Sequence, residues 1–208
     1  MVDGLLFASI RGASSFASIR GWILGRGLLN TRMPTRLLIS LFLFFAFAGQ
    51  LSAQIVAFGA SNVSGSGVTP EQAWPAQLEK MLNAQGYKVR VTNAGLSGDT
   101  TAHMLKRLDD AIPDGTKIVV LDTGGGFYND AKYNISREEG EKNLAAIKAR
   151  IRARGIIIVR EFSYRMSETW KQSDKIHLTA AGHKELARLL VPYVIKALTQ
   201  PGAVEPET

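Results

Sequence analysis

Three residues in two distant segments have the types and spacing needed for covalent catalysis by serine. Ser61 follows the short apolar run IVAFG at 55–59, and Asp174 and His177 lie on the segment DKIH. A serine hydroxyl is a weak nucleophile until a base takes its proton, and that base needs a partner that fixes its tautomer and stabilises its charge. We predict that Ser61, His177 and Asp174 supply these three roles.

The elements around these residues are those that an open α/β sheet would use to position them. The run at 55–59 is typical of a buried parallel strand, so Ser61 stands where a strand passes into a loop. The carboxyl ends of parallel strands form the crevice in which such sheets bind ligands. Asp174 and His177 share one short loop, because the last helix is expected to begin near Thr179.

Strand and helix patterns alternate along the rest of the chain. Thr69 and Ser136 are predicted helix caps, Gly86 and Gly155 are predicted helix stops, and the glycine-rich loops are expected at 93–100 and 123–130. Alternation of this kind requires parallel pairing with right-handed crossovers, and it predicts a three-layer α/β/α sandwich with four or five strands. The expected strands are 55–59, 87–92, 117–122 and 156–160, and the expected helices are 70–85, 101–111, 136–154 and 179 onward.

The basic charge belongs largely to the amino-terminal segment. The 208 residues carry a formal net charge of +7. Residues 1–53 contain five arginines and one aspartate, hence +4, which leaves +3 for the remainder. The body therefore lacks a basic stripe, and we expect no nucleic-acid partner. Three scattered histidines and no cysteine disfavour a metal site, and we expect no cofactor.

The segment 33–53 has the layout of a secretory signal peptide, with a basic start, an apolar stretch and small residues at its end. Cleavage is expected after Ala48 or after Ala53, followed by a periplasmic or secreted bacterial location without stable membrane insertion. Residues 1–32 repeat the sequence FASIRG; we interpret them as an upstream extension or a disordered leader, with a transit peptide as the weaker alternative. The catalytic domain is expected at 54–200 and a disordered tail at 201–208.

The motifs resemble those of the GDSL or SGNH hydrolases, in particular the bacterial secreted esterases that include thioesterase I and the arylesterases. The resemblance extends from about residue 55 to 197, and its most specific parts are NAGLSGDTT at 93–101 and DKIHLTAAGH at 174–183. It implies a flavodoxin-like fold. It also implies that Ser61 is the nucleophile and that the backbone N–H groups of Ser61 and Gly98 contribute to an oxyanion hole.

Two positions depart from the pattern of that family. The first block would ordinarily read Gly-Asp-Ser, but Ala60 precedes the serine here. The third block would ordinarily read Gly-x-Asn-Asp, whereas GGGFYND at 124–130 places Gly126 at the asparagine position of an ungapped alignment. An insertion of two or three residues would align Asn129 instead. We predict that Asn129 is the side-chain oxyanion donor, with the Gly126 backbone N–H as the alternative.

The preferred function is hydrolysis of a small carboxylic ester or thioester through an acyl-enzyme, as in arylesterases, lysophospholipases and thioesterases. The rival is a non-catalytic surface or carbohydrate-binding protein on a decayed hydrolase scaffold. His183, six residues after His177, is expected to be structural. Four aromatic residues are expected to line a substrate pocket: Tyr128, Phe162, Tyr164 and Trp170.

Overall fold

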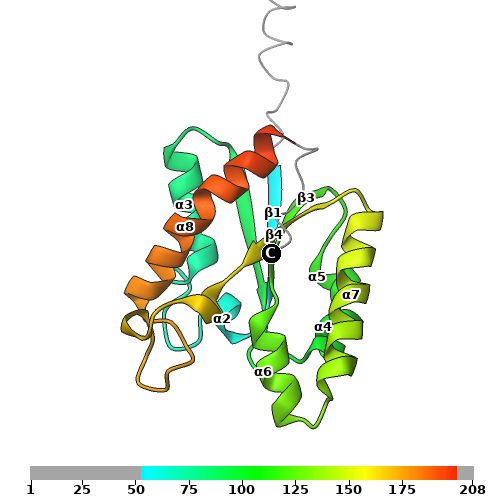
Figure 1. Ribbon diagram of the computed structural model, residues 1–208. Coiled ribbons are helices and arrows are strands. Elements are labelled where there is room, and N and C mark those ends of the chain that lie inside the picture. Colours follow the sequence, from blue (N-terminus) through cyan, green and yellow to red (C-terminus); the bar gives the residue numbers. More distant parts are fainter. Residues whose placement is uncertain (1–52, 201–208) are drawn as a thin grey trace, which may run out of the picture. The chain divides into compact units, whose positions relative to one another are not determined.

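Four parallel strands form the sheet of the computed structural model, which describes residues 53–200 (Figure 1). The strand order is β2-β1-β3-β4, so the chain starts in the middle of the sheet and extends it in both directions. This order is the one expected for a flavodoxin-like arrangement. The strands are β1 (Ala53–Gly59), β2 (Val89–Gly95), β3 (Thr116–Asp122) and β4 (Ile157–Glu161).

Helices cover both faces of the sheet. α3 and α8 pack on one face, and α4, α5 and α7 pack on the other (Figure 1). The helices are α2 (Ser61–Ser64), α3 (Trp74–Ala84), α4 (Thr101–Lys106), α5 (Leu108–Ala111), α6 (Gly124–Lys132), α7 (Arg137–Ala153) and α8 (Ala180–Thr199). Two 3₁₀ turns, η1 (Ser163–Arg165) and η2 (Glu168–Trp170), follow β4. The predicted three-layer sandwich is confirmed.

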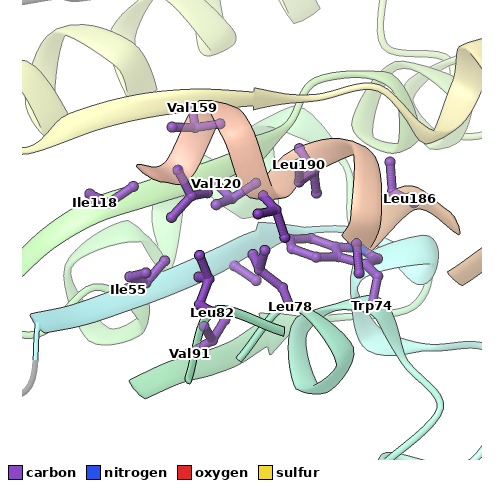
Figure 2. Close-up of a cluster of buried hydrophobic side chains, with 14 of the residues drawn as sticks. Ile55, Trp74, Leu78, Leu82, Val91, Ile118, Val120, Val159, Leu186 and Leu190 are labelled. Atoms are coloured by element: carbon purple, nitrogen blue, oxygen red, sulfur yellow. The ribbon is translucent and has the colours of Figure 1, made fainter. Parts of the chain in front are cut away.

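Two hydrophobic clusters lie on opposite faces of β1. Ile55 belongs to the cluster under α3 and α8, where it packs with Trp74 and Leu190 (Figure 2). Val56 and Phe58 belong to the cluster on the other face. Successive side chains of a strand point to opposite faces, and both faces are covered here, so a central strand must be apolar at every position. This requirement explains the uninterrupted apolar run that precedes Ser61.

The first predicted helix begins later than its local sequence indicates. Gln72 Oε1 accepts a hydrogen bond from Thr69 N–H at 3.1 Å, as a capping box requires, but it closes a separate turn. The helix itself starts at Trp74, whose ring is fully buried, with Pro75 in the first helical turn. Burial of the indole therefore decides where this helix begins.

The glycine-rich segment 123–130 is a helix rather than the predicted loop. Glycine is unfavourable in helices, so the local sequence favours a loop. Two features, one local and one tertiary, override this preference. Asp122 Oδ1 accepts hydrogen bonds from the N–H groups of Gly124 (2.8 Å) and Gly125 (3.0 Å), and it thereby caps α6. In addition, a Cβ at Gly125 would lie 2.7 Å from Ala60 Cβ, so only glycine allows the helix to approach the first loop this closely.

Smaller differences concern the ends of elements. β2 continues through 93–95, which we expected in a loop, and the single helix expected at 101–111 is divided at Arg107 into α4 and α5. The cap at Ser136 is confirmed, because its side chain accepts a hydrogen bond from Glu139 N–H. The expected start of the last helix near Thr179 is also confirmed, and the Thr179 side chain caps it by accepting from Gly182 N–H.

Most of the predicted signal peptide lies outside the described residues. The first described residue, Ala53, already pairs with Val89 in the sheet, and Gln54 pairs with Arg90. A cut after Ala48 would therefore leave β1 whole, whereas a cut after Ala53 would remove the first residue of this strand. Among residues 53–200, no helix has both the length and the apolar character that crossing a bilayer requires.

Candidate active site

The candidate nucleophile stands at the carboxyl end of the central strand. Ser61 is the first residue of α2, immediately after the turn that ends β1. The neighbouring strand end is bound to this turn, because Leu96 N–H donates to the carbonyl of Gly59 at 3.0 Å. Val63 is fully buried and anchors α2 against the sheet. The first and second blocks of the predicted site therefore meet at this edge of the sheet.

Asp174 and His177 form the orienting pair that their spacing predicted. Asp174 Oδ2 lies 2.6 Å from His177 Nδ1, and Asp174 Oδ1 accepts hydrogen bonds from Ile176 N–H (2.9 Å) and His177 N–H (3.0 Å). The bond from Ile176 and the two bonds from His177 lower the pKa of Asp174 to about 2. The carboxylate is therefore ionised at neutral pH. A neutral His177 that donates through Nδ1 keeps the Nε2 lone pair available to accept a proton.

Asn62 connects this pair to the nucleophile. Its side-chain amide donates to the carbonyl of Ile176 at 3.2 Å, and its side-chain oxygen accepts from Leu178 N–H at 3.0 Å. The residue next to Ser61 thus binds the backbone on both sides of His177. Sequence reasoning missed this role, because the two partners of Asn62 lie more than a hundred residues further along the chain.

Gln172 provides a second connection between the same two loops. Its side-chain amide donates to the carbonyls of Ser66 (2.9 Å) and Leu178 (2.8 Å), and its backbone N–H donates to the carbonyl of His177 (2.7 Å). The loop that carries His177 is therefore fixed against the loop that follows Ser61 by side chains from both sides.

Two of the proposed reacting groups are unpaired. Within residues 53–200, neither the Ser61 hydroxyl nor the Gly98 N–H has a hydrogen-bond partner. Gly98 has a φ of +80°, a backbone conformation that favours glycine. The structure thus brings Asp174 and His177 into contact but leaves the Ser61 hydroxyl without a bond to His177. Both the hydroxyl and the Gly98 amide remain available to a substrate.

Asn129 and Gly126 occupy the same face of α6. Asn129 is buried, and its side-chain amide donates to the carbonyl of Asp99 at 2.8 Å, one residue after Gly98. A Cβ at Gly126 would lie 3.1 Å from the side chain of Thr101, also in the second block. Both candidates for the third donor therefore face the loop that carries Gly98. The asparagine amide has two N–H donors, and one is engaged by Asp99.

The four aromatic residues expected to line a pocket lie in two different environments. Tyr128 and Tyr164 are exposed, with relative accessibilities of 57% and 42%. Phe162 and Trp170 instead pack against the cluster under α3 and α8, and the Phe162 ring meets Tyr193 edge to face. Phe162 and Trp170 thus lie at the edge of the hydrophobic core, whereas the two tyrosines are accessible from solvent.

His183 lies in the core rather than beside the nucleophile. It is fully buried in α8, and its Nδ1 accepts a hydrogen bond from Trp74 N–H at 3.3 Å. Burial, assisted by the charge of His177, lowers the pKa of His183 to about 4. The imidazole is therefore neutral at neutral pH and serves as an acceptor for the first turn of α3.

Comparison with known proteins places this site within a family. The model of the GDSL-like lipase/acylhydrolase family matches residues 57–193, a span that contains every candidate site residue. The chain belongs to the GDSL-like lipase/acylhydrolase family. The resemblance stated from the sequence motifs is therefore confirmed.

Relatives of this GDSL-like chain include two bacterial esterases. "Esterase TesA" of Pseudomonas aeruginosa is 34% identical over 108 residues, which are 51% of this chain and 52% of the relative. "Arylesterase" of Vibrio mimicus is 32% identical over 124 residues, 59% of this chain and 61% of the relative. The chain thus spans between half and two thirds of each of these curated relatives. A crystal structure of TesA has a TM-score of 0.59 at 25% identity and covers 68% of this chain and 97% of its own.

Proposed function

We propose that this protein is a serine esterase that hydrolyses carboxylic esters or thioesters. The observation that carries the proposal is the hydrogen bond between Asp174 and His177 on a loop that Asn62 holds beside Ser61. A base with a fixed tautomer next to a free serine hydroxyl is the arrangement that activates serine as a nucleophile. The names of the relatives, an esterase and an arylesterase, support the same class of reaction.

The first half of the proposed reaction forms an acyl-enzyme. Ser61 Oγ attacks the carbonyl carbon while His177 Nε2 takes the hydroxyl proton, and Asp174 stabilises the resulting imidazolium. The oxyanion of the tetrahedral intermediate accepts hydrogen bonds from the N–H groups of Ser61 and Gly98 and from the Asn129 amide. The intermediate collapses as the bond to the alcohol or thiol breaks, and the leaving group takes the proton from His177.

The second half releases the acid. His177 takes a proton from water, and the hydroxide attacks the carbonyl carbon of the acyl group on Ser61. The same donors stabilise the second oxyanion. The ester bond to Ser61 then breaks, and the serine oxygen recovers its proton from His177. The sequence of steps consumes one water and produces one carboxylic acid and one alcohol or thiol.

We further propose that the substrate is a small ester and that Tyr128 and Tyr164 contact it. Both rings are exposed on elements that follow β3 and β4, at the edge of the sheet where Ser61 stands. Phe162 and Trp170 pack against the core, so we propose that they support the pocket from behind the tyrosines and do not contact the substrate directly.

A periplasmic or secreted location is proposed from the leader at 33–53, whose charge and apolar pattern are those of a signal peptide. N-terminal sequencing of the protein exported by a bacterial host tests this proposal. A first residue of Gly49 or Gln54 is expected, and exported protein that still begins at Met1 or Met33 would contradict it.

The substitution Ser61→Ala distinguishes the proposed esterase from the rival, a non-catalytic binding protein. Release of p-nitrophenol from p-nitrophenyl butyrate and labelling by a fluorophosphonate are measured for the parent protein and for Ser61→Ala. We expect Ser61→Ala to lose at least roughly a thousandfold in kcat and all labelling, because the covalent route needs the hydroxyl. Ser66→Ala, which removes a hydroxyl from the same loop, is the control and should keep both. A Ser61→Ala protein with activity within about tenfold of the parent would refute the assignment.

A further inference from the structure

Two acidic residues lie buried side by side at the ends of neighbouring strands. Asp122 is the last residue of β3 and Glu161 is the last residue of β4, and the two are opposite each other in the sheet register. Their relative accessibilities are 1% and 0%. Buried carboxyl groups are costly unless they are neutral or well bonded, so this pair requires a physical explanation.

Asp122 accepts backbone hydrogen bonds at both of its carboxyl oxygens. Its Oδ2 accepts a hydrogen bond from Ala60 N–H at 3.2 Å, and its Oδ1 accepts from the N–H groups of Gly124 (2.8 Å) and Gly125 (3.0 Å). Both oxygens of Asp122 thus act as acceptors. One carboxylate therefore holds both the residue before Ser61 and the amino terminus of α6, the helix that carries Asn129.

Glu161 has the contacts of a neutral acid. Its Oε1 accepts a hydrogen bond from Ser163 N–H at 2.7 Å, but its Oε2 is buried without a partner among the described residues. Burial, and then the negative charge of Asp122, raise the pKa of Glu161 well above its ordinary value. A proton on Glu161 removes the repulsion between two adjacent carboxylates and converts the unpaired oxygen into a donor.

We propose that Asp122 and Glu161 share one proton, with Glu161 as the donor, and that this acid pair positions the Ser61 loop against α6. The catalytic part of this inference rests on the proposed esterase function. Asp122 and Glu161 are positioning residues, because they act through the backbone at Ala60 and the start of α6. The pair supplies a carboxylate beside the nucleophile loop although residue 60 is alanine. The small side chain of Ala60 also allows α6 to approach the Ser61 loop, since a Cβ at Gly125 would already lie 2.7 Å from Ala60 Cβ.

The groups that hydrogen-bond to the pair are uncharged. One cation lies close to it, because Arg107 donates to the carbonyl of Gly59 and a Cβ at Gly59 would meet the Asp122 side chain. From η1, Ser163 contributes its hydroxyl and backbone N–H, and from α6 only glycine N–H groups face Asp122. The Tyr164 ring lies against Gly124, and its hydroxyl accepts a hydrogen bond from Arg160. Asp122 is the ionisable side chain whose charge acts on Glu161.

Substitution of Glu161 by glutamine distinguishes the proposed pair from an ionised glutamate. The glutamine carbonyl can accept from Ser163 N–H while its amide donates to Asp122, so Glu161→Gln reproduces the protonated acid. We expect Glu161→Gln to keep kcat within about threefold of the parent. Glu161→Leu removes the donor, and Asp122→Asn replaces one acceptor oxygen by a donor that faces N–H groups. Each should lower kcat by roughly tenfold or more with a smaller change in KM.

The stability of the same variants tests the proton without reference to catalysis. Glu161 has an ordinary pKa of 4.5 in the unfolded chain, and its pKa is raised in the folded protein. Above pH 4.5 the folded protein therefore keeps a proton that the unfolded chain releases. The parent therefore loses stability as the pH rises from about 4.5 towards the raised pKa of Glu161. Glutamine does not titrate, so the variant does not lose stability in this way. The Tm of Glu161→Gln minus that of the parent should increase between about pH 5 and about pH 7.5.

Glu185→Gln is the matched control for the stability measurement. Glu185 is ion-paired with Arg188 on the surface, and its pKa is lowered, so this Tm difference should stay flat above about pH 5. A flat difference for Glu161→Gln as well would overturn the shared proton. A kcat for Glu161→Gln as low as that of Glu161→Leu would overturn the positioning role. If the parent protein itself has no esterase activity, the proposed function fails, while the stability comparison still decides the acid pair.

Discussion

Replacement of Asn62 by leucine should separate the orientation of His177 from the stability of the fold. Leucine has nearly the shape of asparagine but neither donates nor accepts. The change removes the hydrogen bonds to the Ile176 carbonyl (3.2 Å) and the Leu178 N–H (3.0 Å), which flank His177 on both sides. Gln172 would still connect this loop to the segment after Ser61, but the bonds beside His177 would be lost, so the imidazole would lose part of its alignment with Ser61.

The size of the effect follows from these two bonds. A neutral hydrogen bond contributes about 0.5 to 1.5 kcal/mol net, so the pair is worth about 1 to 3 kcal/mol. If this energy serves to hold His177 in its reactive position, kcat should fall by roughly 5- to 150-fold. KM should change little, because Asn62 binds the backbone of the loop and not the proposed substrate. The rate of fluorophosphonate labelling should decrease together with kcat.

Asn83 offers a matched control. Its side chain makes the same two-bond pairing, donating to the Val89 carbonyl at 3.0 Å and accepting from Val89 N–H at 3.1 Å, but it connects α3 to β2. We expect Asn62→Leu and Asn83→Leu to lower Tm by similar amounts, while only Asn62→Leu lowers kcat. Equal kcat values for the two variants would refute the reasoning, because the bonds of Asn62 would then serve stability alone.

Two further predictions concern the oxyanion hole and the buried histidine. Asn129→Ala should lower kcat by roughly a hundred- to a thousandfold with little change in KM; a nearly silent result would refute the side-chain assignment and favour the alternative donor, the Gly126 backbone N–H. His183 has a native pKa of about 4 against an ordinary 6.5, so its contribution to stability is complete above pH 6.5 and is lost as the pH falls towards 4. The free energy of unfolding of the parent, relative to that of His183→Leu, should therefore decrease by on the order of 3 kcal/mol between about pH 7 and about pH 4.5. The Tm difference between the two proteins should shrink accordingly. An unchanged Tm difference would contradict the burial of a neutral imidazole.

Local patterns were sufficient for most of the fold and for part of the site. The apolar run at 55–59 predicted a central strand because both faces of that strand are covered. Ser136 predicted the start of α7 through a cap that involves only the next three residues. Asp174 and His177 were predicted as a pair for the same reason, since their hydrogen bond lies within one loop.

Features that depend on distant contacts were not predictable in this way. The glycine run at 124–126 forms a helix because Asp122 caps it and because its lack of side chains allows close approach to Ala60 and Thr101. The Asp122 cap is local, but no short window of the sequence contains these glycines together with Ala60 or Thr101. The role of Asn62 was missed for the same reason, although it stands next to the nucleophile.

The two departures from the family pattern are connected by one set of contacts. Ala60 is small enough for the amino terminus of α6 to pack directly against it, and Gly125 provides the matching absence of a side chain. At this close approach a single carboxylate, Asp122, binds the N–H groups of both segments. An aspartate at position 60 would add another acid beside Asp122 in a region closed to solvent, where like charges are strongly unfavourable. The alanine in the first block and the glycines in the third block are therefore parts of one contact, in which Asp122 of β3 binds the backbone of both segments.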